Sequence, residues 1–119
     1  MIKGIGLDIV ELERVEKIMK RTSSFAKKVL TERELAIFEG LSEARKVEFL
    51  AGRFAAKEAY SKANGTGIGE GCTLHQIEIL KDISGKPVLY FDKKEVNGFI
   101  SITHTKTVAA AQVILMECS

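Results

Sequence analysis

The segment from residue 43 to residue 63 constrains the fold most, because it predicts one long helix with a wide apolar face. Apolar residues recur there at helical spacing: Val47, Leu50, Ala51, Phe54, Ala55 and Ala59. Glu58 stands inside this stripe, where a hydrophobic residue is expected, with Arg53, Lys57 and Lys62 close by. Two interpretations are open. Glu58 is a functional carboxylate, or it forms a Glu–Lys pair on a solvated helix face, worth about 0.2–0.5 kcal/mol.

A second carboxylate, Asp8, stands inside the apolar run of residues 5–10. Aspartate is depleted from strands. A strand here places Ile5, Leu7 and Ile9 on one face, and Gly4, Gly6, Asp8 and Val10 on the other. The two glycines beside Asp8 leave room for a ligand or another backbone to approach closely. The alternative is that Asp8 caps a helix that begins near Glu11.

Capping signals and apolar stripes predict the other helices. After the first strand, one helix carries an apolar stripe of Leu12, Val15, Ile18 and Met19, and a basic stripe of Arg14, Lys17 and Arg21. Thr31 and Glu34 form a capping box, reinforced by a staple from Leu30 to Leu35. Ser42 is positioned to cap the long helix, which we expect to end at Asn64 and Gly65.

The second half of the chain predicts antiparallel strands. Residues 73–80 and 87–91 form a hairpin across the turn 82–85, and residues 99–105 and 108–115 form a second one. Residues 92–98 are expected to form a short helix or a turn. One strand, several helices and then strands predict an α+β fold, with an antiparallel sheet packed on one long helix.

Composition sets broad limits on function. The chain has 119 residues and a formal charge of +2, which fits a single domain over residues 1–119 and does not favour a nucleic-acid partner. We find no membrane-spanning run and no secretory signal, so we expect a cytoplasmic protein. Cys72 and Cys118 lack disulfide or metal-ligand spacing, and we interpret both as structural.

Asp8 and Glu58 are hard oxygen ligands suited to Mg²⁺, which takes one or two protein carboxylates and completes its shell with water and phosphates. Lys62 supplies a positive charge for a phosphate. The glycine-rich segment 65–71 offers a backbone that a phosphorylated ligand could approach, although it lacks the order of a Walker loop and is alternatively a flexible turn. His104 lies near three small hydroxyl side chains (Ser101, Thr103 and Thr105), and a lone strand histidine is usually structural.

These residues together resemble the bacterial holo-[acyl-carrier-protein] synthases, the single-domain type of 4′-phosphopantetheinyl transferase. The segment Gly4-Ile5-Gly6-Leu7-Asp8 is similar to the family's G-[IV]-D motif, with Leu7 in a position usually taken by Ile or Val. Residues 54–62 are similar to its F-x-x-K-E-A-x-x-K signature. The segments 65–67 and 101–104 also match, so the resemblance spans nearly the whole chain.

The resemblance implies transfer of the phosphopantetheine arm of coenzyme A to a serine of apo acyl carrier protein in fatty acid biosynthesis. Asp8, Glu58 and Lys62 would be the catalytic residues, with Mg²⁺ on Asp8 and Glu58. Glu58 or a metal-bound water would take the serine proton. Contacts to coenzyme A would come from Arg53, Lys57, Lys62, Gly65, Thr66, Gly67, His104 and Thr105.

Carrier proteins of this pathway are typically acidic, which suggests a docking surface of Arg14, Lys17, Arg21, Lys27 and Lys28, with Phe25 as an apolar anchor. The alternative is that these cations form a solvated helix face. Family members of this short kind resemble half of the longer, two-lobed transferases, which build their site between two similar lobes. The resemblance therefore implies a homo-oligomer, a trimer, with its site between subunits. Two alternatives remain: a non-catalytic, Mg²⁺-dependent coenzyme A or nucleotide binding module, and a structural adaptor that docks acidic helices.

Overall fold

A computed structural model describes residues 1–118 of the chain. In chain order its elements are β1 (Ile2–Glu11), α1 (Leu12–Arg21), α2 (Phe25–Val29), α3 (Glu32–Glu39), α4 (Glu43–Asn64), β2 (Ile77–Lys81), β3 (Pro87–Phe91), β4 (Lys94–Glu95), β5 (Gly98–His104) and β6 (Val108–Met116). One strand, four helices and then five strands confirm the predicted α+β class.

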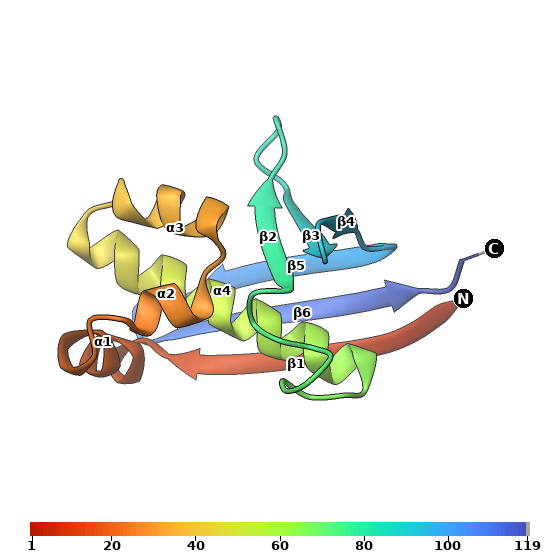
Figure 1. Ribbon diagram of the computed structural model, residues 1–119, viewed down its shortest axis with the longest axis horizontal. Helices are drawn as coiled ribbons and strands as arrows, with labels where there is room; N and C mark the ends of the chain where they lie inside the picture. The colour runs from red at the N-terminus through yellow and green to blue at the C-terminus, as the bar shows by residue number, and fades with distance from the viewer. Residues whose placement is uncertain (119) are drawn as a thin grey trace.

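The antiparallel sheet β1–β6–β5 forms one layer, and α4 lies lengthwise across one face of it (Figure 1). The C-terminal strand β6 is central, since its Ala111 pairs with Asp8 of β1 on one side and with Ile102 of β5 on the other. Alternate residues of β6 are buried in the core beneath α4: Ala109, Ala111, Val113 and Leu115. Helices α1, α2 and α3 gather at one end of α4 (Figure 1).

The glycines of β1 allow α4 to lie directly against the strand. A Cβ atom at Gly4 would overlap the carbonyl oxygen of Ala63, and one at Gly6 would overlap that of Ala59. Of the two uses predicted for these glycines, the structure therefore shows the close approach of another backbone. Asp8 lies within β1 and Glu11 is the residue that precedes α1, so the alternative in which Asp8 caps this helix is wrong.

The smaller sheet β2–β3–β4 is built on the predicted hairpin, which projects away from the larger sheet (Figure 1). Strand β2 begins at Ile77, later than predicted. The reason is a turn: the Gln76 N–H donates to the Thr73 carbonyl, and the Gln76 side chain accepts from the Thr73 N–H.

Residues 92–98 form a turn and a short strand, so of the two predicted forms the turn is correct and β4 was not foreseen. Asp92 and Lys93 connect β3 to β4 with φ angles of 50° and 67°. A two-residue hairpin turn of the mirror-image type needs positive φ at both positions.

The predicted helix caps are confirmed. The Thr31 hydroxyl accepts from the Glu34 N–H, and the Glu34 carboxylate accepts from the Thr31 N–H, which completes the capping box. The Ser42 hydroxyl accepts from the Arg45 N–H at 3.4 Å. Gly65 ends α4 in the left-handed conformation.

Helix α4 is buried on more sides than one apolar stripe requires. Its buried residues include Gly52, Arg53, Ala56 and Lys57 in addition to members of the predicted stripe. The reason is its central place, because the large sheet covers one side and the small sheet and α1–α3 cover others. Within residues 1–118 no helix combines the length and the apolar composition that crossing a membrane requires.

Candidate functional site

Asp8 and Glu58 line one cavity of about 310 Å³, at the border between β1 and the helices. Asp8 projects from the face of β1 that packs on α4, and Glu58 projects from α4 itself. The cavity wall also includes Arg14 of α1, Phe25 of α2 and Phe54 of α4. The structure therefore brings together the two carboxylates that the sequence predicted to act as a pair.

Lys62 is bonded to one of the two carboxylates, Asp8. Its Nζ donates to Asp8 Oδ1 at 2.9 Å and to the Leu7 carbonyl at 3.1 Å. The Lys62 side chain is 52% exposed, whereas that of Asp8 is only 17% exposed. The ammonium group is thus fixed beside Asp8 while it stays accessible to a ligand in solution.

The pKa of Glu58 is raised above its ordinary value of 4.5. Partial burial is the main cause, the negative charge of Asp8 adds to it, and the positive charge of Lys62 opposes it. A divalent cation between the two carboxylates would offset the effect of Asp8 and stabilise the ionised form of Glu58.

The donor set fits Mg²⁺. In the described part of the chain, no group of three or more His, Cys, Asp and Glu side chains could hold a metal ion. Zinc and calcium sites generally need more protein ligands than this pair offers. Mg²⁺ needs only one or two carboxylates when phosphates and water complete its shell.

Arg53 and His104 line a second cavity, of about 270 Å³, between α4, the β2–β3 hairpin and β5. The Arg53 guanidinium carbon lies 4.3 Å from the centre of the Phe49 ring, and His104 Nε2 lies 3.5 Å from Glu48 Oε2. This cavity borders β5, whereas the Asp8–Glu58 cavity borders β1, the opposite edge strand of the sheet.

Two further basic side chains line the second cavity, those of Arg45 and Lys81, and the sequence analysis does not predict either of them. Arg45 precedes Arg53 by two helical turns and so lies on the same face of α4, a signal that was available. Lys81 is the last residue of β2, and its proximity follows only from the way the hairpin packs.

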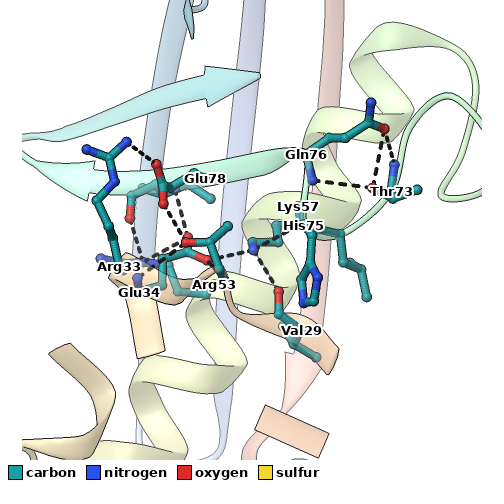
Figure 2. Close-up of polar contacts among 12 residues, drawn as sticks. Val29, Arg33, Glu34, Arg53, Lys57, Thr73, His75, Gln76 and Glu78 are labelled. Carbon is teal, nitrogen blue, oxygen red and sulfur yellow. Dashed lines mark hydrogen bonds and ion pairs between the residues drawn. The ribbon is translucent and has the colours of Figure 1, made fainter. Parts of the chain in front are cut away.

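The expected contact of Lys57 with a nucleotide is wrong. Lys57 is fully buried, and its Nζ donates to Glu34 Oε1 at 2.6 Å, the Val29 carbonyl at 2.7 Å and the Leu74 carbonyl at 2.9 Å (Figure 2). An ammonium group has three donors, so none is left for a ligand.

The loop after α4 uses its backbone N–H groups within the protein. The N–H groups of Gly65, Thr66 and Gly67 all point back to the Ser61 carbonyl, at 3.0–3.2 Å. They satisfy the end of the helix and are not presented to a phosphate. The Thr105 hydroxyl accepts from the Val108 N–H at 3.1 Å and so closes the β5–β6 turn.

The predicted docking residues lie next to the carboxylate cavity. Arg14, Lys17 and Arg21 line a shallow cavity on the exposed side of α1, and Arg14 and Ile18 line the Asp8–Glu58 cavity as well. Phe25 is half-buried, with its ring centre 6.3 Å from that of Phe54. Lys28 is exposed in α2.

A larger cavity of about 650 Å³ lies between α3, β2 and the β3–β4 turn. Three of its charged groups are engaged by protein side chains: Arg33 donates to Glu78 at 2.7 Å, and Gln76 donates to Asp92 at 3.1 Å. Size alone does not make it the functional site.

Comparison with known proteins gives one family. Residues 4–114 match the model of the 4′-phosphopantetheinyl transferase superfamily. The chain is 53% identical over 119 residues to a holo-[acyl-carrier-protein] synthase of Geobacillus sp. (strain WCH70), and both chains are covered completely. It is 53% identical over 116 residues to the corresponding synthase of Listeria monocytogenes, covering 97% of this chain and 98% of the relative.

Solved structures that resemble this chain belong to the same kind of protein. A holo-(acyl-carrier-protein) synthase from Bacillus anthracis, in complex with CoA (3′,5′-ADP), aligns with a TM-score of 0.85 at 48% identity, covering 97% of this chain and 96% of the other. The synthase from Neisseria meningitidis aligns with a TM-score of 0.88 at 34% identity, covering 98% and 100%. The chain therefore belongs to the 4′-phosphopantetheinyl transferase superfamily.

Proposed function

We propose that this protein is a holo-[acyl-carrier-protein] synthase that acts in fatty acid biosynthesis in the cytoplasm. The observation that carries the proposal is the cavity lined by Asp8 and Glu58, with Lys62 bonded to Asp8 beside it, in a chain so similar to synthases of this kind. The serine Oγ of an apo carrier protein attacks the β-phosphorus of coenzyme A. The bond from this phosphorus to the oxygen that bridges it to the nucleotide breaks, and adenosine 3′,5′-bisphosphate leaves.

Asp8 and Glu58 would hold Mg²⁺, which supplies charge neutralisation for the pyrophosphate. Lys62 is half-exposed and already fixed on Asp8, so its ammonium group can turn one donor to a phosphate oxygen without losing its position. Positioning and charge stabilisation of this kind provide most of the catalysis in phosphoryl transfer.

We assign the serine proton to Glu58, directly or through an intervening water. Burial and the charge of Asp8 raise the pKa of Glu58 in the protein alone, whereas a cation held by Glu58 would lower it, so the water is the better proton acceptor while Mg²⁺ is bound. The proton leaves the serine as its oxygen bonds to phosphorus.

The cavity of Arg53 and His104 would hold the phosphates of the nucleotide part of coenzyme A, together with Arg45 and Lys81. The Arg53 Nε donates to the Ile79 carbonyl at 3.1 Å, so the guanidinium group is fixed before a ligand arrives. Arginine suits phosphate because its planar donors match the phosphate oxygens in pairs.

We further propose a homotrimer whose site combines the Asp8–Glu58 cavity of one subunit with the Arg53–His104 cavity of the next. The two cavities border opposite edge strands of the sheet, so contact between copies would join them. The outer face of β1 supports this proposal. Ile5, Leu7 and Ile9 are 55–62% exposed there, and Phe99 of β5 is 57% exposed. Such an apolar surface is typical of an interface between subunits.

The acidic carrier protein would dock on α1 and α2 through Arg14, Lys17, Arg21, Lys28 and Phe25. Arg14 lines both the shallow cavity of α1 and the carboxylate cavity, so a carrier bound there would present its serine beside Asp8 and Glu58. Charges of this kind mainly raise the rate of encounter and set orientation.

The direct test is the intact mass of apo acyl carrier protein after incubation with this protein, coenzyme A and Mg²⁺. We expect a gain of one phosphopantetheine group, and loss of the gain with a chelator or with Asp8→Ala. Coenzyme A binding without any mass gain would instead support the non-catalytic binding module.

A further inference from the structure

Lys57, a residue of the family signature, is buried within the protein and bonded only to protein groups in the described chain. Its three donors connect α4 to three other segments: Val29 at the end of α2, Glu34 in α3, and Leu74 before β2 (Figure 2). Each bond is 2.9 Å or shorter. Lys57 therefore links α4 to three other segments inside the protein.

Its partner Glu34 is fully buried as well and is bonded at both oxygens. Oε1 accepts from Lys57 and from the Thr31 N–H at 2.9 Å, and Oε2 accepts from the Ile79 N–H at 2.8 Å. The carboxylate thus connects the start of α3, the middle of α4 and strand β2.

Arg53 completes the cluster one turn before Lys57, on the same side of α4. Its Nε donates to the Ile79 carbonyl at 3.1 Å and lies 4.0 Å from Glu34 Oε2. Strand β2 is an edge strand of the small sheet. The N–H and C=O of its residue Ile79 bond to side chains of α3 and α4. These bonds leave α4 little freedom to slide or turn.

The rotation of α4 matters because Glu58 is the next residue after Lys57. Successive side chains leave a helix about 100° apart, so the direction of Lys57 determines the direction of Glu58. On the β1 side, Ala59 and Ala63 lie against Gly6 and Gly4. That contact consists of small groups and backbone, whereas the cluster around Lys57 is directional.

We propose that Lys57 is a positioning residue, whose three hydrogen bonds fix the rotation of α4 that holds Glu58 beside Asp8. The proposal rests on the proposed function, in which these two carboxylates share a divalent cation. It predicts that the loss of these bonds lowers metal affinity and turnover, without weakening the binding of coenzyme A when that binding is measured at saturating Mg²⁺.

The test uses two variants and one control. Lys57→Met keeps the length of the side chain but leaves Glu34 as a buried charge without its partner, so this variant is expected to be unstable. Glu34→Gln/Lys57→Met removes both charges and regains stability, yet it cannot restore the bonds to Val29 and Leu74. Lys46→Met, near the start of the same helix, is the control for removing a lysine.

Mn²⁺ affinity is measured by electron paramagnetic resonance, and kcat and KM for coenzyme A are measured by carrier-protein mass. For the double variant we expect Mn²⁺ affinity to fall about 10–100-fold and kcat to fall about 10²-fold, with KM for coenzyme A within about twofold. Recovery of Mn²⁺ affinity and kcat together with stability would show a merely structural role. An unchanged Mn²⁺ affinity with a raised KM would show a ligand contact. Either result overturns the proposal.

The wild-type protein separates this inference from the proposed function. If it binds Mn²⁺ but transfers nothing, the proposed function fails, and the Mn²⁺ affinities of the variants still decide whether Lys57 positions Glu58. If it does not bind Mn²⁺, the shared cation and the positioning proposal are both overturned.

Discussion

Glu58 is harder to ionise than a carboxylate in water, and this property suits a cation site. Its pKa is raised by burial and by Asp8, while Lys62 offsets only part of the effect. Binding of a cation favours the ionised form and recovers this unfavourable energy. Glu58 is therefore a carboxylate whose charge a bound cation would stabilise, and shifted pKa values of this kind are common at functional sites.

Glu58→Gln is accordingly expected to stabilise the protein while it removes activity. Because ionised Glu58 is unfavourable in the folded chain, the variant gains stability at pH 7, by at most about 1 kcal/mol given its partial exposure. The gain should disappear as the pH falls below 4.5, where Glu58 is protonated in both states. Urea denaturation across this pH range measures it, and transfer activity should fall at least about 10²-fold. A variant that is less stable at pH 7 would contradict this account of Glu58.

Gly6 tests the contact between β1 and α4. Gly6→Ala would place a methyl group on the Ala59 carbonyl, so we expect a loss of about 1–3 kcal/mol in the free energy of unfolding. Gly69→Ala is the matched control, since nothing lies within 4 Å of its Cβ, and its effect should stay within about 0.5 kcal/mol. Equal effects of the two substitutions would argue against direct backbone packing at Gly6.

For single residues, the sequence predicts those features of the site that follow from local sequence patterns. Asp8 and Glu58 are recognisable because they interrupt apolar patterns, and Lys62 because it lies one helical turn after Glu58; the structure brings the three together. Lys57 was misjudged because its partners, Glu34 and the Leu74 carbonyl, are distant in sequence. No periodicity shows that a lysine will find three buried acceptors.

Among the elements, α3 and α4 begin with caps of different strength. Thr31 takes part in a complete capping box and also donates to Glu78, whereas Ser42 makes one exposed bond of 3.4 Å. We expect Thr31→Ala to lower the free energy of unfolding by about 1–2 kcal/mol, and Ser42→Ala to lower it by about 0.5 kcal/mol. Chemical denaturation of both variants checks the order, and a larger loss at Ser42 would contradict it.

The types of the secondary-structure elements could be predicted more accurately than the residues at which they begin and end. The capping box, the left-handed Gly65 and the two hairpins follow from residues that are near one another in the chain. The late start of β2 depends on a side-chain bond of Gln76, and β4 depends on two non-glycine residues with positive φ. The pairing of β1 with β6 joins the two ends of the chain, so local patterns could not predict it.

For the whole molecule, the outer face of the large sheet is the feature that a single chain leaves unexplained. Leu7 is 55% exposed there, between Ile5 and Ile9. If this face joins subunits, Leu7→Asp should give a single-chain mass in sedimentation and lose transfer activity, while the fold seen by circular dichroism is retained. Ile83→Asp, an equally polar change at an exposed hairpin tip, should keep the oligomer and the activity. An active monomeric Leu7→Asp protein would exclude the shared site.

The most direct test of the central claim, a site assembled from the two cavities of different copies, is complementation between two inactive variants. Asp8→Ala removes the carboxylate half of the site, and His104→Ala removes part of the nucleotide half. After co-refolding in equal amounts, random assembly gives about one quarter of interfaces with both halves intact, so transfer activity should reappear at about a quarter of the wild-type value. A mixture as inactive as its two components, with mixed oligomers demonstrated by mass, would show that each chain uses its own two cavities and would contradict the account.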